Sequence, residues 1–404
     1  TIHAYSVLLV GFYFSISDEN ANRLLYLIGY IVGSELIWRG YAANIFWESG
    51  KIFIIFFLII IITRLRLKKV NGKIGMLFIF LLIPSLVQLD YINRTDLSHA
   101  LLGPILIGIA VTVFSNIFLD RNTLINIMIS ILMPIITFFI ITNFNTLESG
   151  NFNYTSAYLH RIETGGIGPN QASNILGLGA LIAFILSQFK MKNYSLFFIL
   201  TSTAIIIQTL LTHSRGGFWN TMIAIFIFYF LQLSTTNSRI KLLAGVFPLI
   251  FSFYYVIFPF LDEISGGSIV SRFSDADLTS REHIINAEIY AYKENPILGI
   301  GPGQGRNYRL STFGTYRHTH TEYTRLIAEH GLFGLISVFV LIIIFYKTYQ
   351  NKSGFEKSIS MVLMSWGFLF MIHSATRLAA PCLLIGLATA RMQINENRDS
   401  LLNY

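Results

Sequence analysis

The stretch Lys51-Ile-Phe-Ile-Ile-Phe-Phe-Leu-Ile-Ile-Ile-Ile-Thr-Arg64-Leu-Arg66-Leu-Lys68-Lys69 places an unbroken apolar run directly before a basic loop. Similar blocks of roughly 14 to 22 apolar residues recur along the chain, and about 20 suffice for a helix to cross a bilayer. Of the 404 residues, 53% are hydrophobic and only 12% are charged, about half the charged fraction of a soluble domain. A β-barrel would instead alternate apolar and polar residues. We therefore predict an all-α polytopic membrane protein.

Thirteen apolar blocks are candidate spans, and because the first and last are short we expect about twelve transmembrane helices. The candidates are 3–16, 21–38, 51–63, 74–89, 98–119, 123–142, 171–188, 195–211, 217–233, 241–260, 331–346, 358–373 and 378–391.

Lysine and arginine in the short loops predict the orientation, because such loops stay on the cytoplasmic side. When spans are counted alternately, four basic loops fall on one side. They contain Arg64 to Lys73, Lys190 with Lys192, Arg239 with Lys241, and Lys347 with Lys352 and Lys357. The opposite, outer side then receives 39–50, 90–98, 143–170, 212–216, 261–330 and 374–377.

The large outer loop 261–330 carries most of the polar residues and is the predicted functional region, with 143–170 as a smaller outer loop. Neither an internal repeat nor a soluble domain is evident, so residues 1–404 are predicted to form one integral membrane domain. No stretch is typical of a cleavable signal peptide. Cys382 is the single cysteine, which excludes an intramolecular disulfide and a cysteine-based metal site and predicts a packing role.

The net charge of +8 lies mostly in short connections between apolar blocks. Membrane topology and anionic lipid explain this placement more simply than nucleic acid does. We therefore predict membrane lipids, and no nucleic acid, as partners.

The segment His213-Ser214-Arg215-Gly216-Gly217 lies at the outer end of a span. Guanidinium groups bind phosphate oxygens in a bidentate way, and glycines permit close approach of a ligand or another backbone. A diphosphate head group would suit this site. The alternative is that Arg215 extends to the membrane interface beside Trp219.

The segment Asn295-Pro-Ile-Leu-Gly299-Ile-Gly301-Pro302-Gly303-Gln-Gly305 resembles a nucleotide loop in its glycines alone. It has no Walker lysine, and Pro302 interrupts the turn that would open a helix. We predict a non-helical loop, followed by a membrane-entering helix from about Thr319, with Thr319 or Thr321 as N-cap.

His320 is the candidate general base, because its unperturbed pKa lies near neutrality and a helix start favours the neutral ring. Helical spacing places Tyr323 and Thr324 on its face, and Glu322 with Arg325 and Glu329 on another. Two alternatives remain open: His318 and His320 are simple surface residues, or they form a metal-binding pair that recruits Glu322.

Charged residues also alternate with tryptophan in 35–40 and 46–51. Either they form an aromatic belt with charges extended to the interface, or they line the mouth of a polar cavity. Arg94, Arg161 and Arg377 add positive charge on the same side, and converging arginines would attract an anion.

Together these motifs resemble the O-antigen ligase superfamily. The resemblance rests on Arg215-Gly-Gly after a span, Asn295-Pro-x-x-Gly299-x-Gly301 in a large outer loop, and His320 followed by Glu329-x-Gly331-x-x-Gly334. It covers about 160–345, whereas 1–150 match only as a hydrophobic pattern. Most members have Asn after the histidine, where this chain has Thr321.

The resemblance implies a GT-C-like glycosyltransferase in the bacterial inner membrane that is active on the periplasmic face. It also implies a reaction that inverts the configuration of the anomeric carbon and needs no metal or other cofactor. It implies an undecaprenyl-diphosphate-linked glycan as donor, a glycan or lipid A-core as acceptor, and a chain-length regulator as a partner. His320 is implied as the catalytic base and Arg215 as the diphosphate ligand. We predict further substrate-binding side chains on the same face: Arg161, Arg281, Arg306, Arg309, Arg317, His318, Tyr323, Arg325 and Arg377.

Two alternatives concern the activity. The run from Thr321 to Gly331 favours a Wzy-type polymerase over a ligase that transfers to lipid A core. A polysaccharide flippase would show duplicated halves with polar sites near mid-membrane, whereas the polar residues here gather in outer loops. Ionisable residues at span ends, such as Arg215 and His373, disfavour a purely structural scaffold.

Overall fold

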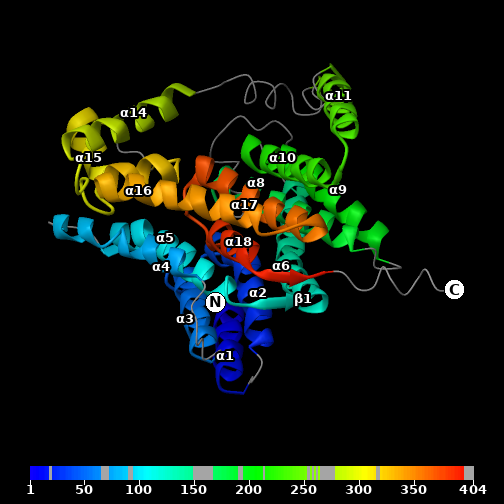
Figure 1. Cartoon of the computed structure of the whole chain (residues 1–404), viewed down its shortest axis with the longest axis horizontal. Coiled ribbons are helices and arrows are strands. Elements are labelled where there is room, and N and C mark those ends of the chain that lie inside the picture. Colours follow the sequence, from blue (N-terminus) through cyan, green and yellow to red (C-terminus); the bar gives the residue numbers. More distant parts are fainter. Residues whose placement is uncertain are drawn as a thin grey trace. The chain divides into compact units, whose positions relative to one another are not determined.

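The computed structural model describes residues 1–17, 21–64, 72–89, 94–148, 167–189, 194–212, 214–252, 255–256, 259–260, 263, 278–314 and 319–394. Helices make up almost all of them (Figure 1). Within these ranges the only strands are β1 (Phe118–Asp120) and β2 (Arg391–Gln393), which pair in parallel with Leu119 opposite Met392.

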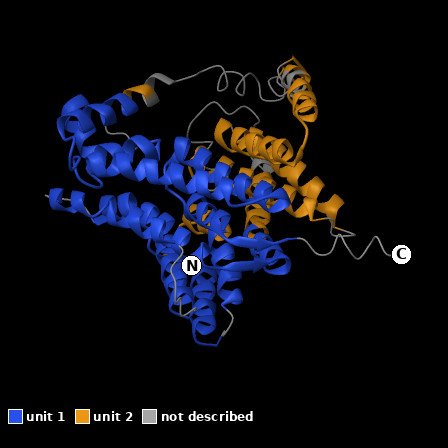
Figure 2. Ribbon diagram, viewed as in Figure 1, with its two compact units in different colours: residues 1–32, 45–131, 284–404 blue, residues 33–44, 132–283 orange. Residues whose placement is uncertain are grey.

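The chain forms two compact units, which Figure 2 colours separately. Unit 1 comprises Thr1–Val32, Ile45–Ile131 and Ile284–Tyr404, and unit 2 comprises Gly33–Asn44 and Leu132–His283. Three helices supply residues to both units: α2 (Asn22–Gly40), α6 (Arg121–Glu148) and α14 (Leu278–Glu294).

The remaining helices belong to one unit each. Unit 1 contains α1 (Ile2–Ser17), α3 (Ser49–Arg64), α4 (Lys73–Phe80), the 3-10 helix η1 (Pro84–Gln88), α5 (Arg94–Phe114), α15 (Gly305–Phe313), α16 (Glu322–Gln350), α17 (Gly354–Ser374) and α18 (Ala379–Thr389). Unit 2 contains α8 (Pro169–Gln188), α9 (Ser195–Leu211), α10 (Arg215–Gln232) and α11 (Thr236–Ser252).

Five helices in the described part of the chain are long and apolar enough to cross a membrane. They are α5, the Arg121–Asn145 part of α6, α8, α16 and α17. Shorter apolar helices occupy Ile2–Ser17, Ser195–Leu211 and Ala379–Thr389, and α4 together with η1 occupies Lys73–Gln88. The chain is thus an all-α membrane protein by its helices, as predicted, while the number of about twelve spans stays a prediction.

The predicted span 74–89 is not one continuous helix. α4 ends at Phe80, and the 3-10 helix η1 begins at Pro84. Proline lacks the backbone N–H that would continue the helical hydrogen bonds, so the chain changes its helix type there.

The core of unit 1 packs α18 between α5 and α17. Close approach depends on glycine, since a Cβ on Gly386 of α18 would lie 2.5 Å from the Cβ of Ala110 in α5. Gly367 of α17 likewise permits contact with α18, where a Cβ would lie 3.1 Å from the carbonyl oxygen of Pro381. Cys382 is buried in α18, which fits its predicted packing role.

Candidate active site

His320 lies just before α16, and Thr321 occupies the N-cap position with an extended backbone. The predicted helix start is confirmed, although the Thr321 hydroxyl makes no capping hydrogen bond. Instead, the turn after α17 holds the segment from the side. The amide of Ala375 donates to the carbonyl of His320 at 3.2 Å, and Arg377 Nη2 donates to the carbonyl of Thr319 at 2.6 Å. The His320 side chain is half-buried.

The turn that holds His320 is itself strained. Ala375 has φ of 50° and ψ of −148°, in the left-handed range that residues with a Cβ rarely adopt. Such a conformation costs about 1–3 kcal/mol and persists only where surrounding contacts enforce it. One enforcing contact is the hydrogen bond that Thr376, the next residue, donates from its amide to Glu322 Oε2 at 3.1 Å.

The Arg325 guanidinium is the centre of a buried ion network in the first turns of α16. Its Nε and Nη2 donate to the two carboxylate oxygens of Glu322 at 3.2 and 2.5 Å, and Nη1 donates to Glu329 at 3.5 Å. Nη2 also donates to the carbonyl of Ala100 in α5 at 3.0 Å. Pro104, four residues later in α5, has no N–H for this carbonyl. Arg325 therefore replaces a missing helical donor and joins α16 to α5.

A second buried pair links α14 and α15 to the His320 segment. Glu288 of α14 accepts from Arg309 Nη1 of α15 at 2.9 Å and from Thr324 Oγ1 at 2.5 Å. Burial raises the pKa of the Glu288 carboxyl, against the opposing effect of Arg309. Burial likewise lowers the pKa of Arg309. Thr324 lies in the first turn of α16, shortly after His320, so α14 and α15 help to position the start of this helix.

The predicted non-helical glycine loop is confirmed and packs against α16. Gly299, Gly301 and Gly303 have φ of 73°, 92° and 82°, which only glycine adopts readily. A Cβ on Gly299 would lie 2.4 Å from the carbonyl carbon of Glu329. Opposite, Gly331 has φ of 60° and kinks α16, which the sequence reading missed. These glycines allow one backbone to approach another.

Four predicted substrate-binding side chains have partners within the protein. Arg309 and Arg325 are 3% and 7% exposed and lie in ion pairs, and their role in binding substrate stays a prediction. Tyr323 Oη donates to the carbonyl of Phe368 at 3.0 Å. Arg377 binds the Thr319 carbonyl, and burial, followed by the charge of Arg325, lowers the pKa of Arg377 to about 10. At neutral pH Arg377 therefore remains protonated.

Arg215 is the first residue of α10, in unit 2, and is half-buried. Gly217 brings this helix against α8, because a Cβ there would lie 1.9 Å from the carbonyl oxygen of Ser173. Thr221 Oγ1 adds a hydrogen bond to the carbonyl of Gly177 at 2.8 Å. The glycines thus admit another backbone, as predicted. A guanidinium at a helix N-terminus adds its charge to that of the helix dipole and suits an anion.

Some predicted residues fall outside the part of the chain that the structure describes. Arg161, His213, Arg317 and His318 lie outside the described residues, and Arg281 belongs to α14 without a described side chain. The metal-binding alternative and the choice between His318 and His320 therefore stay as predicted. Among the side chains that are described, no three His, Cys, Asp or Glu residues gather as metal ligands.

The charged residues of 35–51 form buried ion pairs within each unit. In unit 2, Arg39 Nη2 lies 2.6 Å from Glu35 Oε1. In unit 1, Glu48 lies 2.7 Å from Lys51 Nζ and 3.5 Å from His99 Nε2. Lys51 is fully buried, so its side chain does not extend to a membrane–water interface as the aromatic-belt alternative requires. Sequence reasoning missed His99 because Glu48 is distant from it along the chain.

Comparison with known proteins finds one family model that covers these residues. Residues 196–339 match the model of a family described as O-antigen ligase, which confirms the predicted resemblance. The match includes Arg215, the glycine loop, His320 and the Arg325 network. No curated protein matches the chain.

Proposed function

We propose that this protein is a polyprenyl-diphosphate-dependent glycosyltransferase of the multi-pass membrane type, because residues 196–339 match the model of a family described as O-antigen ligase. The family supports a ligase or polymerase type of activity. Our proposal adds the donor, an undecaprenyl-diphosphate-linked oligosaccharide, and the location, the periplasmic face of the bacterial inner membrane. The acceptor is a sugar hydroxyl.

In the proposed reaction, His320 accepts the proton of the acceptor hydroxyl while that oxygen attacks the anomeric carbon. The bond from this carbon to the diphosphate oxygen breaks, undecaprenyl diphosphate leaves, and the configuration inverts. A positioned base contributes roughly 10²–10⁴-fold. The observation that carries this role is the pair of hydrogen bonds that hold the carbonyls of Thr319 and His320 in place. The His320 ring itself is half-buried.

Arg215 has the diphosphate role in this proposal, because the leaving group gains negative charge as the anomeric bond breaks. Arg306, which is half-buried in α15, remains a substrate-binding proposal, as do Arg161, Arg281 and Arg317. We assign a positioning role to Arg325, Arg309 and Arg377. They bond to Glu322, to Glu288 and to the carbonyl of Thr319, respectively.

The role of His320 is tested with the purified full chain in nanodiscs and a lipid-linked oligosaccharide donor. We expect His320→Ala to lower transfer by at least about 10²-fold without a change in thermal stability. His283→Ala is the matched control, because His283 is an exposed histidine of α14, and it should keep full activity. Wild-type turnover in His320→Ala would contradict the proposal.

We favour a polymerase over a ligase, from the run after His320. The same preparation distinguishes them. Ladders of product formed from the lipid-linked oligosaccharide alone indicate a polymerase, whereas a product that requires added lipid A core indicates a ligase. A chain-length regulator would then narrow the distribution of ladder lengths.

A further inference from the structure

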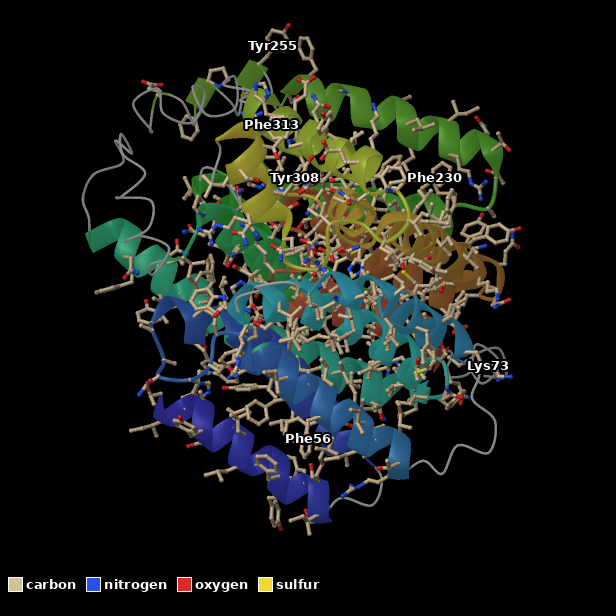
Figure 3. All side chains as sticks on the ribbon, turned by 90° about the vertical axis from the view of Figure 1, so that its left-hand side faces the viewer. Phe56, Lys73, Phe230, Tyr255, Tyr308 and Phe313 are labelled. Carbon is tan, nitrogen blue, oxygen red and sulfur yellow. The ribbon has the colours of Figure 1, made fainter. Side chains whose placement is uncertain are left out.

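Helices α14 and α15 expose aromatic rings, although neither helix is a candidate span. Tyr290 and Phe313 are 48% and 49% exposed, with ring centroids 6.0 Å apart and planes at 81°. The ring centroids of Tyr308 and Phe313 lie 6.5 Å apart, and Figure 3 labels both side chains. We name Tyr290, Tyr308 and Phe313 the aromatic platform. It joins the two helices at the surface of unit 1.

The carboxylate of Glu294 lies beside the aromatic platform. Tyr308 Oη donates to Glu294 Oε2 at 2.5 Å, and Glu294 is exposed. Burial, followed by the hydrogen bond to Glu294, raises the pKa of Tyr308 to about 12. Tyr308 therefore remains a donor at neutral pH and fixes the carboxylate beside the rings.

We propose that the aromatic platform binds the glycan chain, as a subsite for sugars next to the reacting one; this inference rests on the proposed function. A pyranose ring presents C–H groups on its face and hydroxyl groups on its edge. Exposed rings would stack on the face, and the Glu294 carboxylate would accept hydrogen bonds from the hydroxyls. A hydrocarbon surface offers the carboxylate no donor, so the mixed chemistry favours a saccharide over the bilayer.

Contacts beneath the aromatic platform connect it to the candidate base. Arg309 of α15 pairs with Glu288 of α14, and Glu288 accepts from Thr324, near the start of α16. These contacts lie within unit 1. Sugars held on the platform would therefore be positioned relative to the His320 segment through buried, paired groups.

The test measures binding of a defined probe, the soluble glycan released by mild acid from the lipid-linked donor of the native cell. The double variant Tyr290→Ala/Phe313→Ala is compared with Ile289→Ala/Leu310→Ala in full-length protein in nanodiscs. Ile289 and Leu310 are 42% and 47% exposed on the same two helices, which makes them a matched aliphatic control. We expect calorimetry to show binding about tenfold weaker for the aromatic variant and unchanged for the control.

Unchanged binding in the aromatic variant would overturn the proposal. Equal weakening in both variants would also overturn it, since that pattern indicates a general apolar surface such as a membrane contact. Transfer assays separate this inference from the proposed function. A wild-type protein that binds glycan through the platform but transfers none refutes the function alone. Transfer with an acceptor KM that the aromatic variant does not raise refutes the platform alone.

Discussion

The His320 region of unit 1 and the Arg215 region of unit 2 are held by different kinds of interaction. Around His320, the backbone is positioned by buried charges, with Arg325 bonded to Glu322 and to a carbonyl of α5. Around Arg215, α10 is positioned by glycine contacts and neutral hydrogen bonds, such as Thr221 to Gly177.

This difference predicts different sensitivities. A buried charge that loses its partner is left uncompensated in a medium of low dielectric constant, so the His320 region should respond strongly to charge changes. A helix contact made by glycine has no space for a side chain, so the Arg215 region should respond to volume. A general base requires accurate placement, whereas a cation beside a diphosphate tolerates small displacements because its field extends further.

The largest expected effect comes from Arg325→Met. It leaves Glu322 and Glu329 buried without their cation, which typically costs about 3–5 kcal/mol. We expect a large fall in the midpoint of thermal unfolding for the purified protein, together with loss of transfer.

The matched test of this prediction is the triple variant Arg325→Met/Glu322→Gln/Glu329→Gln. Removing all three charges should restore much of the lost stability, because no uncompensated ion remains. If the single and triple variants are equally unstable, packing rather than charge holds the His320 region.

The next largest effect is expected in the other region, from Gly217→Ala. The added Cβ would meet the carbonyl oxygen of Ser173 at 1.9 Å, so α10 must separate from α8 at a cost of about 1–3 kcal/mol or more. Gly245→Ala in α11 is the control, since nothing lies within 4 Å of its Cβ position. If the two variants unfold at the same temperature, the space between α10 and α8 does not determine the stability of the Arg215 region.

A smaller effect, confined to activity, is expected from Arg215→Lys. Lysine keeps the charge but cannot reproduce the planar, bidentate fork, so we expect transfer to fall about tenfold with unchanged unfolding. Lys347→Arg, in the last turn of α16, is the control: it exchanges one cationic side chain for another away from Arg215, and it should leave transfer unchanged. Full activity of Arg215→Lys would mean that charge alone is required.

The sequence predicted the parts of this structure that depend on local pattern. Apolar blocks located α5, α8, α16 and α17, because each span must satisfy its own backbone groups in lipid. The glycines of 299–303 predicted an irregular loop, and Thr321 predicted the start of α16. The break at Pro84 was readable from the missing amide, and our continuous span 74–89 overlooked it.

The contacts that position His320 were not predictable, because they join distant residues. Pro104 signals a carbonyl without a helical donor at Ala100, yet nothing local identifies Arg325, 225 residues away, as the replacement. The pairing of Glu288 with Arg309 and Thr324 is equally hidden. Arginines in a predicted outer loop suggested substrate binding, and the sequence did not reveal that Arg309 and Arg325 also form internal ion pairs.

The smallest expected effect concerns the pH dependence of unit 1, through Glu288→Gln. The pKa of the Glu288 carboxyl is raised above 4.5 in the folded protein. The folded state therefore binds more protons than the unfolded chain above that pH, and stability declines as pH rises through the raised pKa. Glutamine removes this decline but also leaves Arg309 without its carboxylate, which shifts the stability by an amount nearly independent of pH. The free energy of unfolding of the variant minus that of wild type should consequently rise from about pH 4.5 upward, as measured by denaturant titrations in detergent. A flat difference would mean that Glu288 keeps an ordinary pKa, because the pairing with Arg309 and the hydrogen bonds then fully offset the cost of burying the carboxylate.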